Sequence, residues 1–330
     1  MAESSNRIAL GFSGLQYPLP ELVEYSLLAE RLGYESIWVT ETRQFTDAIS
    51  VLGALAATTK RIKLSSGIIP IYTRTATLIA QSYATLDLLS DGRIMVGIGP
   101  GASLFLERQG LSWVKPLAAI REYVTVIRGL LRGETVTFEG KVVRVKDSKL
   151  DLTPIQKTIP IYVAASGARM LTLCGEIADG VVLNCFTPLQ YLSRAVELVR
   201  EGAERVGRDP ASVDISALIY VSVDKDVSKA CSMLKPMLAR YLAQQPHIAR
   251  DSGMSDDAIR AVRSAFGYNG IQDAVQLIDD NVVQAINLAC TPSECKKKLQ
   301  AYREVGIDLP VVMTLSNTKE IARLLAPGSS

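Results

Sequence analysis

The stretch of residues 62–101 predicts a strand, a helix and a second strand in direct succession. Residues 62–66 and 94–97 are short apolar runs, and residues 75–89 place apolar side chains at helical spacing. Two strands joined by a helix form a βαβ unit, which implies a parallel sheet. Glycines follow both strands, namely Gly67 after the first and Gly97, Gly99 and Gly101 in and after the second. Because parallel sheets bind ligands at the carboxyl ends of their strands, and glycine lets a flat ligand approach the backbone, we expect a ligand here.

The same alternation of strand and helix continues along the chain. Further strands are predicted at residues 8–11, 36–40, 159–164, 180–184, 215–223 and 309–314. Helices are predicted at residues 20–32, 47–60, 116–132, 168–177, 189–206 and 318–325. No linker rich in Pro, Gly and Ser divides the chain, so residues 1–330 are predicted to form a single α/β domain, a (β/α)₈ TIM barrel.

Two segments depart from this alternation. Residues 133–158 are expected to be a small insertion between strands 4 and 5, with a hairpin formed by residues 135–138 and 141–145. Residues 226–305, after strand 7, are predicted to be a long, mostly helical segment with breaks at residues 267–270 and 291–292.

Composition excludes several classes of protein. The 36 basic and 34 acidic residues nearly cancel, and no basic stripe suggests a nucleic-acid partner. The five cysteines show neither a CxxC pair nor a metal-ligand spacing, so we expect free thiols in a cytoplasmic protein and no metal site. No segment is apolar for long enough to span a membrane, and the N-terminal residues lack an apolar signal core. The expected partner is a small-molecule substrate.

The segments that follow the predicted strands are small, glycine-rich and mostly uncharged. In a barrel these segments form the ligand site, and such a lining suits a large planar cofactor held by backbone contacts. The candidate cofactor-binding residues are Ser13, Thr40, Glu41, Ser66, Gly67, Ile68, Gly99, Ala165, Ser166, Gly167, Ala168 and Asn184.

Residues 165–168 lie between a predicted strand and a predicted helix. The free N–H groups of a helix N-terminus, with the hydroxyl of Ser166 beside them, would form an anion site suited to phosphate. The alternative is that Ser166 is an ordinary N-cap residue.

Few residues are candidates for proton transfer. The single histidine, His247, falls in the helical segment after strand 7 and is better explained as a surface residue than as a general base. Glu41, Asp47 and Glu107 are the candidate acids, and Glu41 is the preferred catalytic residue because it directly follows the second strand.

Taken in order, short motifs along the chain resemble those of the bacterial luciferase-like superfamily. The motifs are SIWVTE at 36–41, SGI at 66–68, YTR at 72–74, ATLD at 84–87, SDGR at 90–93, GIGPG at 97–101, GLSWVKP at 110–116, ADG at 178–180 and TPSEC at 291–295. Within the superfamily the chain is most similar to the coenzyme F420-dependent branch, which includes the methylenetetrahydromethanopterin reductases.

The resemblance implies an F420-dependent oxidoreductase that transfers hydride between reduced F420 and a small organic substrate such as a methylene-tetrahydropterin. It implies a cis peptide at Gly67-Ile68 beneath the deazaflavin ring, phosphate binding at residues 165–168, and Glu41 near the cofactor. It also implies a homodimer or higher homo-oligomer that uses the helices after strands two and three, and residues 47–60 are small and apolar almost all round their helix.

Three positions depart from the family pattern. Gly11 and Ala102 stand where the methanopterin reductases carry carboxylates, which leaves the pterin substrate open. Thr42 stands where luciferase-type monooxygenases place a histidine, which argues against oxygen chemistry. The alternatives are an FMN-dependent monooxygenase, a methylenetetrahydrofolate reductase that uses NAD(P)H, and a catalytically silent flavin-binding barrel.

Overall fold

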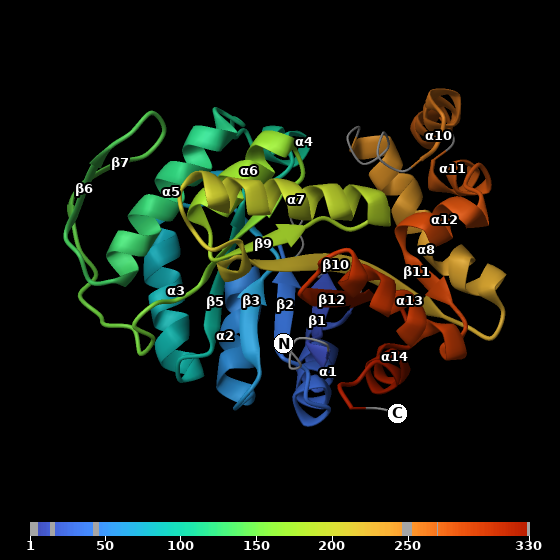
Figure 1. Cartoon of the computed structure of the whole chain (residues 1–330), viewed down its shortest axis with the longest axis horizontal. Coiled ribbons are helices and arrows are strands. Elements are labelled where there is room, and N and C mark those ends of the chain that lie inside the picture. The colour runs from blue at the N-terminus through green and yellow to red at the C-terminus, as the bar shows by residue number, and fades with distance from the viewer. Residues whose placement is uncertain (1–5, 14–16, 42–45, 246–252, 269, 329–330) are drawn as a thin grey trace.

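Eight parallel strands form a closed ring at the centre of the molecule (Figure 1). The computed structural model describes residues 6–13, 17–41, 46–245, 253–268 and 270–328. The ring strands, in spatial order, are β1 (Ala9–Ser13), β2 (Ser36–Thr40), β3 (Lys63–Ser66), β5 (Ile94–Gly99), β8 (Ile161–Ala165), β9 (Gly180–Leu183), β10 (Asp214–Val223) and β12 (Leu309–Thr314). The last strand pairs with the first, Ala9 aligning with Val311, so the predicted (β/α)₈ barrel is confirmed.

Helices surround the ring on the outside. They are α1 (Leu19–Arg31), α2 (Ala48–Thr58), α3 (Ala76–Ser90), α5 (Pro116–Leu131), α6 (Ala168–Ile177), α7 (Leu189–Arg205), α8 (Val227–Gln244), α13 (Pro292–Glu304) and α14 (Thr318–Leu324). Seven of them lie within about two residues of their predicted positions, and α8 and α13 fall within the segment predicted to be mostly helical.

The strands are buried on both faces, which explains why they read as continuous apolar runs. In β2, Ile37 and Val39 belong to the core between strands and helices, whereas Trp38 belongs to a second core inside the ring. This inner core continues outward beneath α8.

Helices α6 and α7 make an unusually close backbone contact. A Cβ atom on Gly175 would lie 2.0 Å from the carbonyl oxygen of Val199, and one on Gly202 would lie 2.0 Å from that of Thr172. Only glycine fits at either position, and the two helices are thereby held as one unit against the barrel.

The insertion between β5 and β8 is a hairpin of β6 (Val136–Glu139) and β7 (Arg144–Ser148), which lies outside α5 (Figure 1). The second strand begins later than predicted. Three backbone N–H groups of the connecting loop, those of residues 141–143, donate to the buried carboxylate of Glu122 at 2.8 Å. The loop is therefore bonded to α5 instead of extending the ladder.

The helical segment after strand 7 contains a short strand that was not predicted. Besides α8 it has α10 (Asp256–Tyr268), α11 (Ile271–Gln276) and α12 (Asp280–Ile286), followed by β11 (Leu288–Cys290), which pairs with β10. Three apolar residues cannot be distinguished from a helix end by periodicity. Strand β4 (Ile69–Pro70) and helix α4 (Ser103–Glu107) are also additions, both beside the ligand end of the barrel.

None of the described helices has both the length and the apolar character that crossing a bilayer requires.

Candidate active site

A cavity of about 1110 Å³ opens at the carboxyl ends of the strands. Ten of the predicted cofactor-binding residues line it, namely Ser13, Thr40, Glu41, Gly67, Ile68, Ala165, Ser166, Gly167, Ala168 and Asn184. They come from segments as distant in sequence as β1 and β9, and only the closed ring brings them together.

The other two candidates, Ser66 and Gly99, lie behind the cavity wall. The hydroxyl of buried Ser66 donates to the carbonyl of Gly97 at 2.5 Å and lies 2.5 Å from the hydroxyl of Tyr83, whose pKa is raised by burial. A Cβ atom on Gly99 would lie 3.0 Å from the side chain of Ile68. Neither residue is among those that line the cavity, and both shape the wall from behind.

The peptide bond Gly67-Ile68 is cis, as predicted, and both residues line the cavity. Behind Gly67 lies the indole of Trp38, 3.4 Å from where a Cβ atom of Gly67 would be. Trp38 in turn meets the ring of Tyr162 edge-on at 5.2 Å, and the Tyr162 hydroxyl donates to Asp214 at 2.7 Å. Aromatic side chains inside the ring therefore support this part of the wall.

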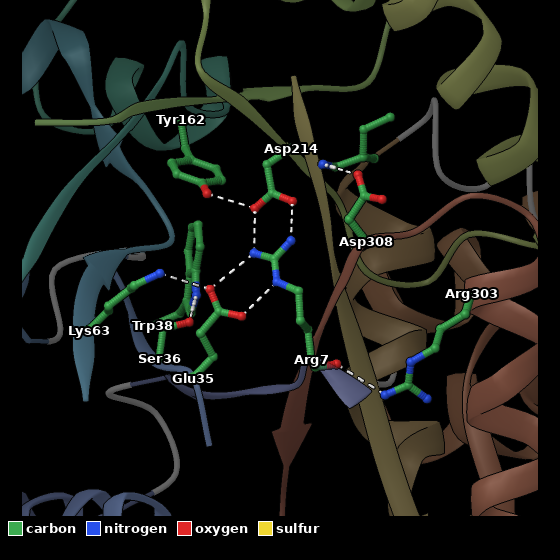
Figure 2. Close-up of polar contacts among 10 residues, drawn as sticks. Arg7, Glu35, Ser36, Trp38, Lys63, Tyr162, Asp214, Arg303 and Asp308 are labelled. Carbon is green, nitrogen blue, oxygen red and sulfur yellow. Dashed lines mark hydrogen bonds and ion pairs between the residues drawn. The ribbon is translucent and has the colours of Figure 1, made fainter. Parts of the chain in front are cut away.

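Asp214 is part of a charged network at the opposite, amino-terminal end of the barrel (Figure 2). The guanidinium of Arg7 binds Glu35 at 2.6 Å and Asp214 at 2.7 Å, and Lys63 reaches Glu35 from the solvent side at 3.1 Å. Burial raises the pKa of Glu35, but the hydrogen bond and charge of Arg7 outweigh it and hold the pKa below its usual value. The network closes the end of the barrel that does not carry the cavity.

The hydroxyl of Thr40 is buried and has no hydrogen-bond partner among the described residues. An unmet buried hydroxyl costs about 1–3 kcal/mol, so most are paired. Since Thr40 lines the cavity, a polar atom of a bound ligand would satisfy it. The cavity thus fits a ligand with a hydrogen-bonding group over β2.

The loop before α6 exposes a helix N-terminus to the cavity. Gly167, not Ser166, is the N-cap residue, and no side chain caps the helix. The hydroxyl of Tyr191 fixes the loop by donating to the carbonyl of Ser166 at 2.5 Å. The first N–H groups of a helix have no intrahelical partner and attract anions, so the loop suits a phosphate group.

Glu41 lines the cavity but is already bonded on two sides. It receives a hydrogen bond from Arg74 at 2.5 Å and another from the backbone N–H of Ala48 at 3.1 Å. Arg74 also contacts Asp47 at 3.0 Å. Burial lowers the pKa of Arg74, but the carboxylates of Glu41 and Asp47 outweigh burial and raise this pKa above its usual value. Arg74 was not predicted as a site residue, although it is the one basic residue in the YTR motif.

The remaining candidates for proton transfer are less well placed. Asp47, the N-terminal flanking residue of α2, also lines the cavity but is 42% exposed and bound to Arg74. Glu107 is exposed at the end of α4 and is not among the residues that line the cavity. His247 lies outside the described residues. Within the described ranges no group of His, Cys, Asp and Glu side chains is arranged to hold a metal ion.

Aromatic residues that sequence reasoning did not find line the far side of the cavity. Tyr220 of β10 and Tyr241 of α8 both contact Phe186, with ring centroids 4.9 and 4.6 Å away. No local pattern marks them, because they meet only through the packing of α8 over β10. Beside them burial raises the pKa of the Cys185 thiol to about 12, so this thiol stays protonated at neutral pH.

The two positions that lack the expected carboxylates have different surroundings. A Cβ atom on Gly11 would lie 2.2 Å from the sulfur of Met313, so Met313 fills the space that a longer side chain would need. Ala102 lies at the cavity edge and is only partly buried.

The fold and the cavity together define a (β/α)₈-barrel protein with its ligand site at the carboxyl ends of the strands. The chain belongs to the luciferase-like monooxygenase family, whose model matches residues 5–309.

Relatives are similar along nearly their whole length. The chain is 33% identical over 292 residues to 5,10-methylenetetrahydromethanopterin reductase of Methanolobus tindarius, covering 88% of this chain and 89% of the relative. It is 29% identical to the F420-dependent glucose-6-phosphate dehydrogenase of Segniliparus rotundus, covering 91% and 90%. Among solved structures, the coenzyme F420-dependent tetrahydromethanopterin reductase of Methanopyrus kandleri superimposes with a TM-score of 0.89 at 28% identity, covering 98% of this chain and 97% of that one.

Proposed function

We propose that the protein is a coenzyme F420-dependent oxidoreductase that transfers hydride between the cofactor and a small organic substrate. The observation that best supports this proposal is the arrangement of a single cavity. The uncapped N-terminus of α6 lies in its wall, as does the hydroxyl of Thr40, which has no hydrogen-bond partner in the described part of the chain, and the lining is mostly apolar. This arrangement suits a planar ring joined to a phosphate. The F420-dependent relatives support the same assignment.

The chain's own residues would bind and orient the cofactor. The N–H groups at the start of α6 would hold the phosphate, and the backbone at Gly67-Ile68, supported by Trp38, would carry the ring. The hydroxyl of Thr40 would bond a polar edge of the ring. When bound, reduced F420 supplies the hydride from C5, and the protein supplies position and electrostatics.

The substrate we propose carries an electrophilic carbon that is already activated, such as the iminium form of a methylene-tetrahydropterin. Among the described residues, Gly11, Met313 and Ala102 stand here without a carboxylate, so none of these three positions supplies a proton donor. A cationic iminium needs little acid catalysis to accept hydride. The methanopterin reductases among the relatives support this class of substrate.

Equilibrium titration of the purified apoprotein with F420, FMN and NADH tests the cofactor. We expect binding of F420 in preference to the other two. Tight FMN binding with oxygen consumption would replace the proposal with a monooxygenase, and binding of NADH alone would replace it with a nicotinamide-dependent reductase.

We also propose a cytoplasmic homodimer that uses α2 and α3. The outward face of α2 carries Ser50, Ala54 and Ala57, and the end of α3 exposes Leu88 and Leu89 by 45% and 54%. Such a small-residue and leucine face favours burial against a second copy. All five cysteines are free and buried, which favours a reducing compartment. Light scattering is expected to give twice the 35.8 kDa chain mass, and a monomer mass at micromolar concentration would overturn the dimer.

A further inference from the structure

Two of the five cysteines meet where strand β11 ends and helix α13 begins. Cys290 is the last residue of β11, Cys295 lies near the start of α13, and both side chains are fully buried. The motif TPSEC at residues 291–295 links the two positions. Neither cysteine is among the residues that line the cavity, so this motif has a role apart from the cofactor site.

The way in which α13 begins brings the two side chains together. Thr291 is the N-cap residue, and Glu294 accepts hydrogen bonds from its backbone N–H at 3.1 Å and from its hydroxyl at 2.8 Å. In a helix that begins with such a capping box, the residue before the N-cap often packs against the fourth residue of the helix. Here these two residues are Cys290 and Cys295, so the helix start places one thiol against the other.

The two thiols are hydrogen-bonded to each other and differ in acidity. The bond with Cys295 lowers the pKa of Cys290 below its usual value although burial opposes this, and the charge of Lys298 also favours the thiolate. The same bond, together with burial, raises the pKa of Cys295. Lys298 is fixed nearby, because its amine donates to the carbonyl of Ala289 at 3.0 Å. Cys290 is therefore suited to react first, with Cys295 in contact to react second.

The other three cysteines have oxygen atoms as neighbours. The sulfur atoms of Cys174 and Cys231 lie 4.0 and 3.8 Å from backbone carbonyl oxygens. The sulfur of Cys185 lies 3.4 Å from the side-chain oxygen of Asn184. These thiols serve as internal controls for the reactivity of the pair.

Only one turn of helix separates the pair from solvent. Residues 292–294, between the two cysteines, are exposed, as are residues 296 and 297. Helix ends open locally at little cost in free energy compared with the core of a protein. A small oxidant can therefore reach the sulfur atoms without global unfolding.

We propose that Cys290 and Cys295 form a redox site that closes to a reversible disulfide when the protein meets hydrogen peroxide. The Cys290 thiolate attacks one peroxide oxygen, the O–O bond breaks, and the hydroxide that leaves takes up a proton to become water. The Cys295 sulfur, losing its proton, then attacks the sulfenic acid on Cys290, and a second water leaves as the S–S bond forms. The two sulfur atoms together lose two electrons, and one peroxide is reduced to two waters.

The disulfide would fasten the start of α13 to the end of β11, which pairs with β10 of the ring. A thiol reductant would reverse it by thiol–disulfide exchange.

The experiment exposes the folded full chain to hydrogen peroxide, removes the peroxide with catalase, and alkylates the remaining thiols in denaturant. We expect the free thiols to fall from five to three per chain and to return to five after treatment with dithiothreitol. Trypsin leaves both cysteines in the peptide of residues 264–296, because no Lys or Arg precedes Lys296 in it. This peptide should be unalkylated and lighter than its reduced form by two hydrogen atoms.

Single variants separate the two chemical steps. In Cys295→Ser the reaction should stop at the sulfenic acid of Cys290, which dimedone traps. Cys231→Ser is the matched control: it makes the same exchange at a buried cysteine of α8, outside the pair, and it should still lose two thiols. Circular dichroism checks that both variants are folded.

Four results would overturn the site. They are five thiols remaining in the native protein after peroxide, a disulfide that involves any other cysteine, a disulfide between two chains, and a Cys290–Cys295 disulfide that forms only after urea has unfolded the protein. The last result would show that the folded helix start does not present the thiols to each other. None of these outcomes depends on which cofactor the cavity binds.

Discussion

At the scale of single residues, the packing of Met313 against Gly11 determines which side chain lines this part of the cavity. They align across the pair of β1 and β12, and the thioether occupies the space beside Gly11. A residue with a longer side chain at either position would have to displace the other. The absence of a carboxylate side chain at Gly11 and the presence of Met313 therefore follow from the same packing.

This coupling predicts a non-additive pair of substitutions. Gly11→Ala alone should lower the free energy of unfolding by about 1–3 kcal/mol, because its Cβ overlaps the sulfur of Met313. In the background of Met313→Ala the same change should cost far less. Urea unfolding of the two single variants and the double variant measures the coupling, and additive free energies would contradict it.

Glu41 predicts a different kind of effect. Glu41→Gln removes the charge that holds Arg74 and weakens the bond from Ala48, so the wall beside the ring should loosen. We expect weaker cofactor binding with little change in turnover at saturation. If instead turnover falls by about 10²–10⁴-fold, Glu41 transfers a proton. His247→Ala should change neither quantity, and loss of activity in that variant would relocate the active site.

At the scale of elements, the start of α6 and the hairpin loop each bring several backbone N–H groups together, but these groups have different roles. Three N–H groups of the loop converge on Glu122, and those at the start of α6 are left open toward the cavity. One set fastens the insertion to the barrel, and the other stays available to a ligand.

The hairpin predicts a local and pH-dependent change. Glu122→Gln should release the loop, because an amide carbonyl is a weaker acceptor than the carboxylate it replaces. Hydrogen exchange at residues 141–143 should accelerate while the barrel strands stay protected. In the native protein the pKa of Glu122 is lowered, so this stabilisation is present above its unfolded-state pKa and is lost as pH falls through the native value. Exchange that is unchanged in the variant would contradict the assignment.

The loop before α6 gives a prediction for cofactor binding. A Cβ atom on Gly167 would meet nothing within 4 Å, so Gly167→Asp should leave the fold intact. Its carboxylate would repel a phosphate at the helix start, and F420 affinity should fall. Gly167→Ala is the control and should bind nearly as well. Unchanged affinity of the aspartate variant in a titration would rule out this phosphate site.

The elements themselves were largely predictable, whereas their contacts were not. Strand β2 matches its prediction because SIWVT is a buried run closed by polar residues on both sides. The sequence predicts the second hairpin strand too early, because no pattern reveals that Glu122, on another element, accepts hydrogen bonds from the N–H groups of residues 141–143. Tyr241 was missed for the same reason, since it reaches the cavity only by the docking of α8.

At the scale of the whole molecule, the charged network at the amino-terminal end ties together strands that are far apart in the sequence. Arg7 and Asp214 are separated by 207 positions, and Arg7 binds Glu35 on the other side. The network therefore depends on the closed ring and stabilises it in return.

Removing Arg7 should be costly and should change the response to pH. Arg7→Met should lower the free energy of unfolding by roughly 2–3 kcal/mol, less than for a fully buried pair because its side chain is 30% exposed. In the native protein the lowered pKa of Glu35 means that its stabilisation is lost as pH falls. Without Arg7, burial should raise that pKa, with Lys63 compensating only in part, so acidification should now restore stability. Unfolding at about pH 7 and about pH 4.5 measures this, and a constant difference from the native protein would contradict it.

The pairing of β1 with β12 has a consequence for how the protein is made. The ring joins residues near the beginning of the chain to residues 309–314, and both ends contribute to the cavity through Ser13 and Met313. During synthesis, every earlier strand leaves the ribosome before the cavity can exist, and β1 must wait with one edge unpaired. A chain that stops before β12 keeps two open edges, on β1 and β10, which invite aggregation. The ligand site in this fold therefore forms only when the final strand, β12, joins the ring.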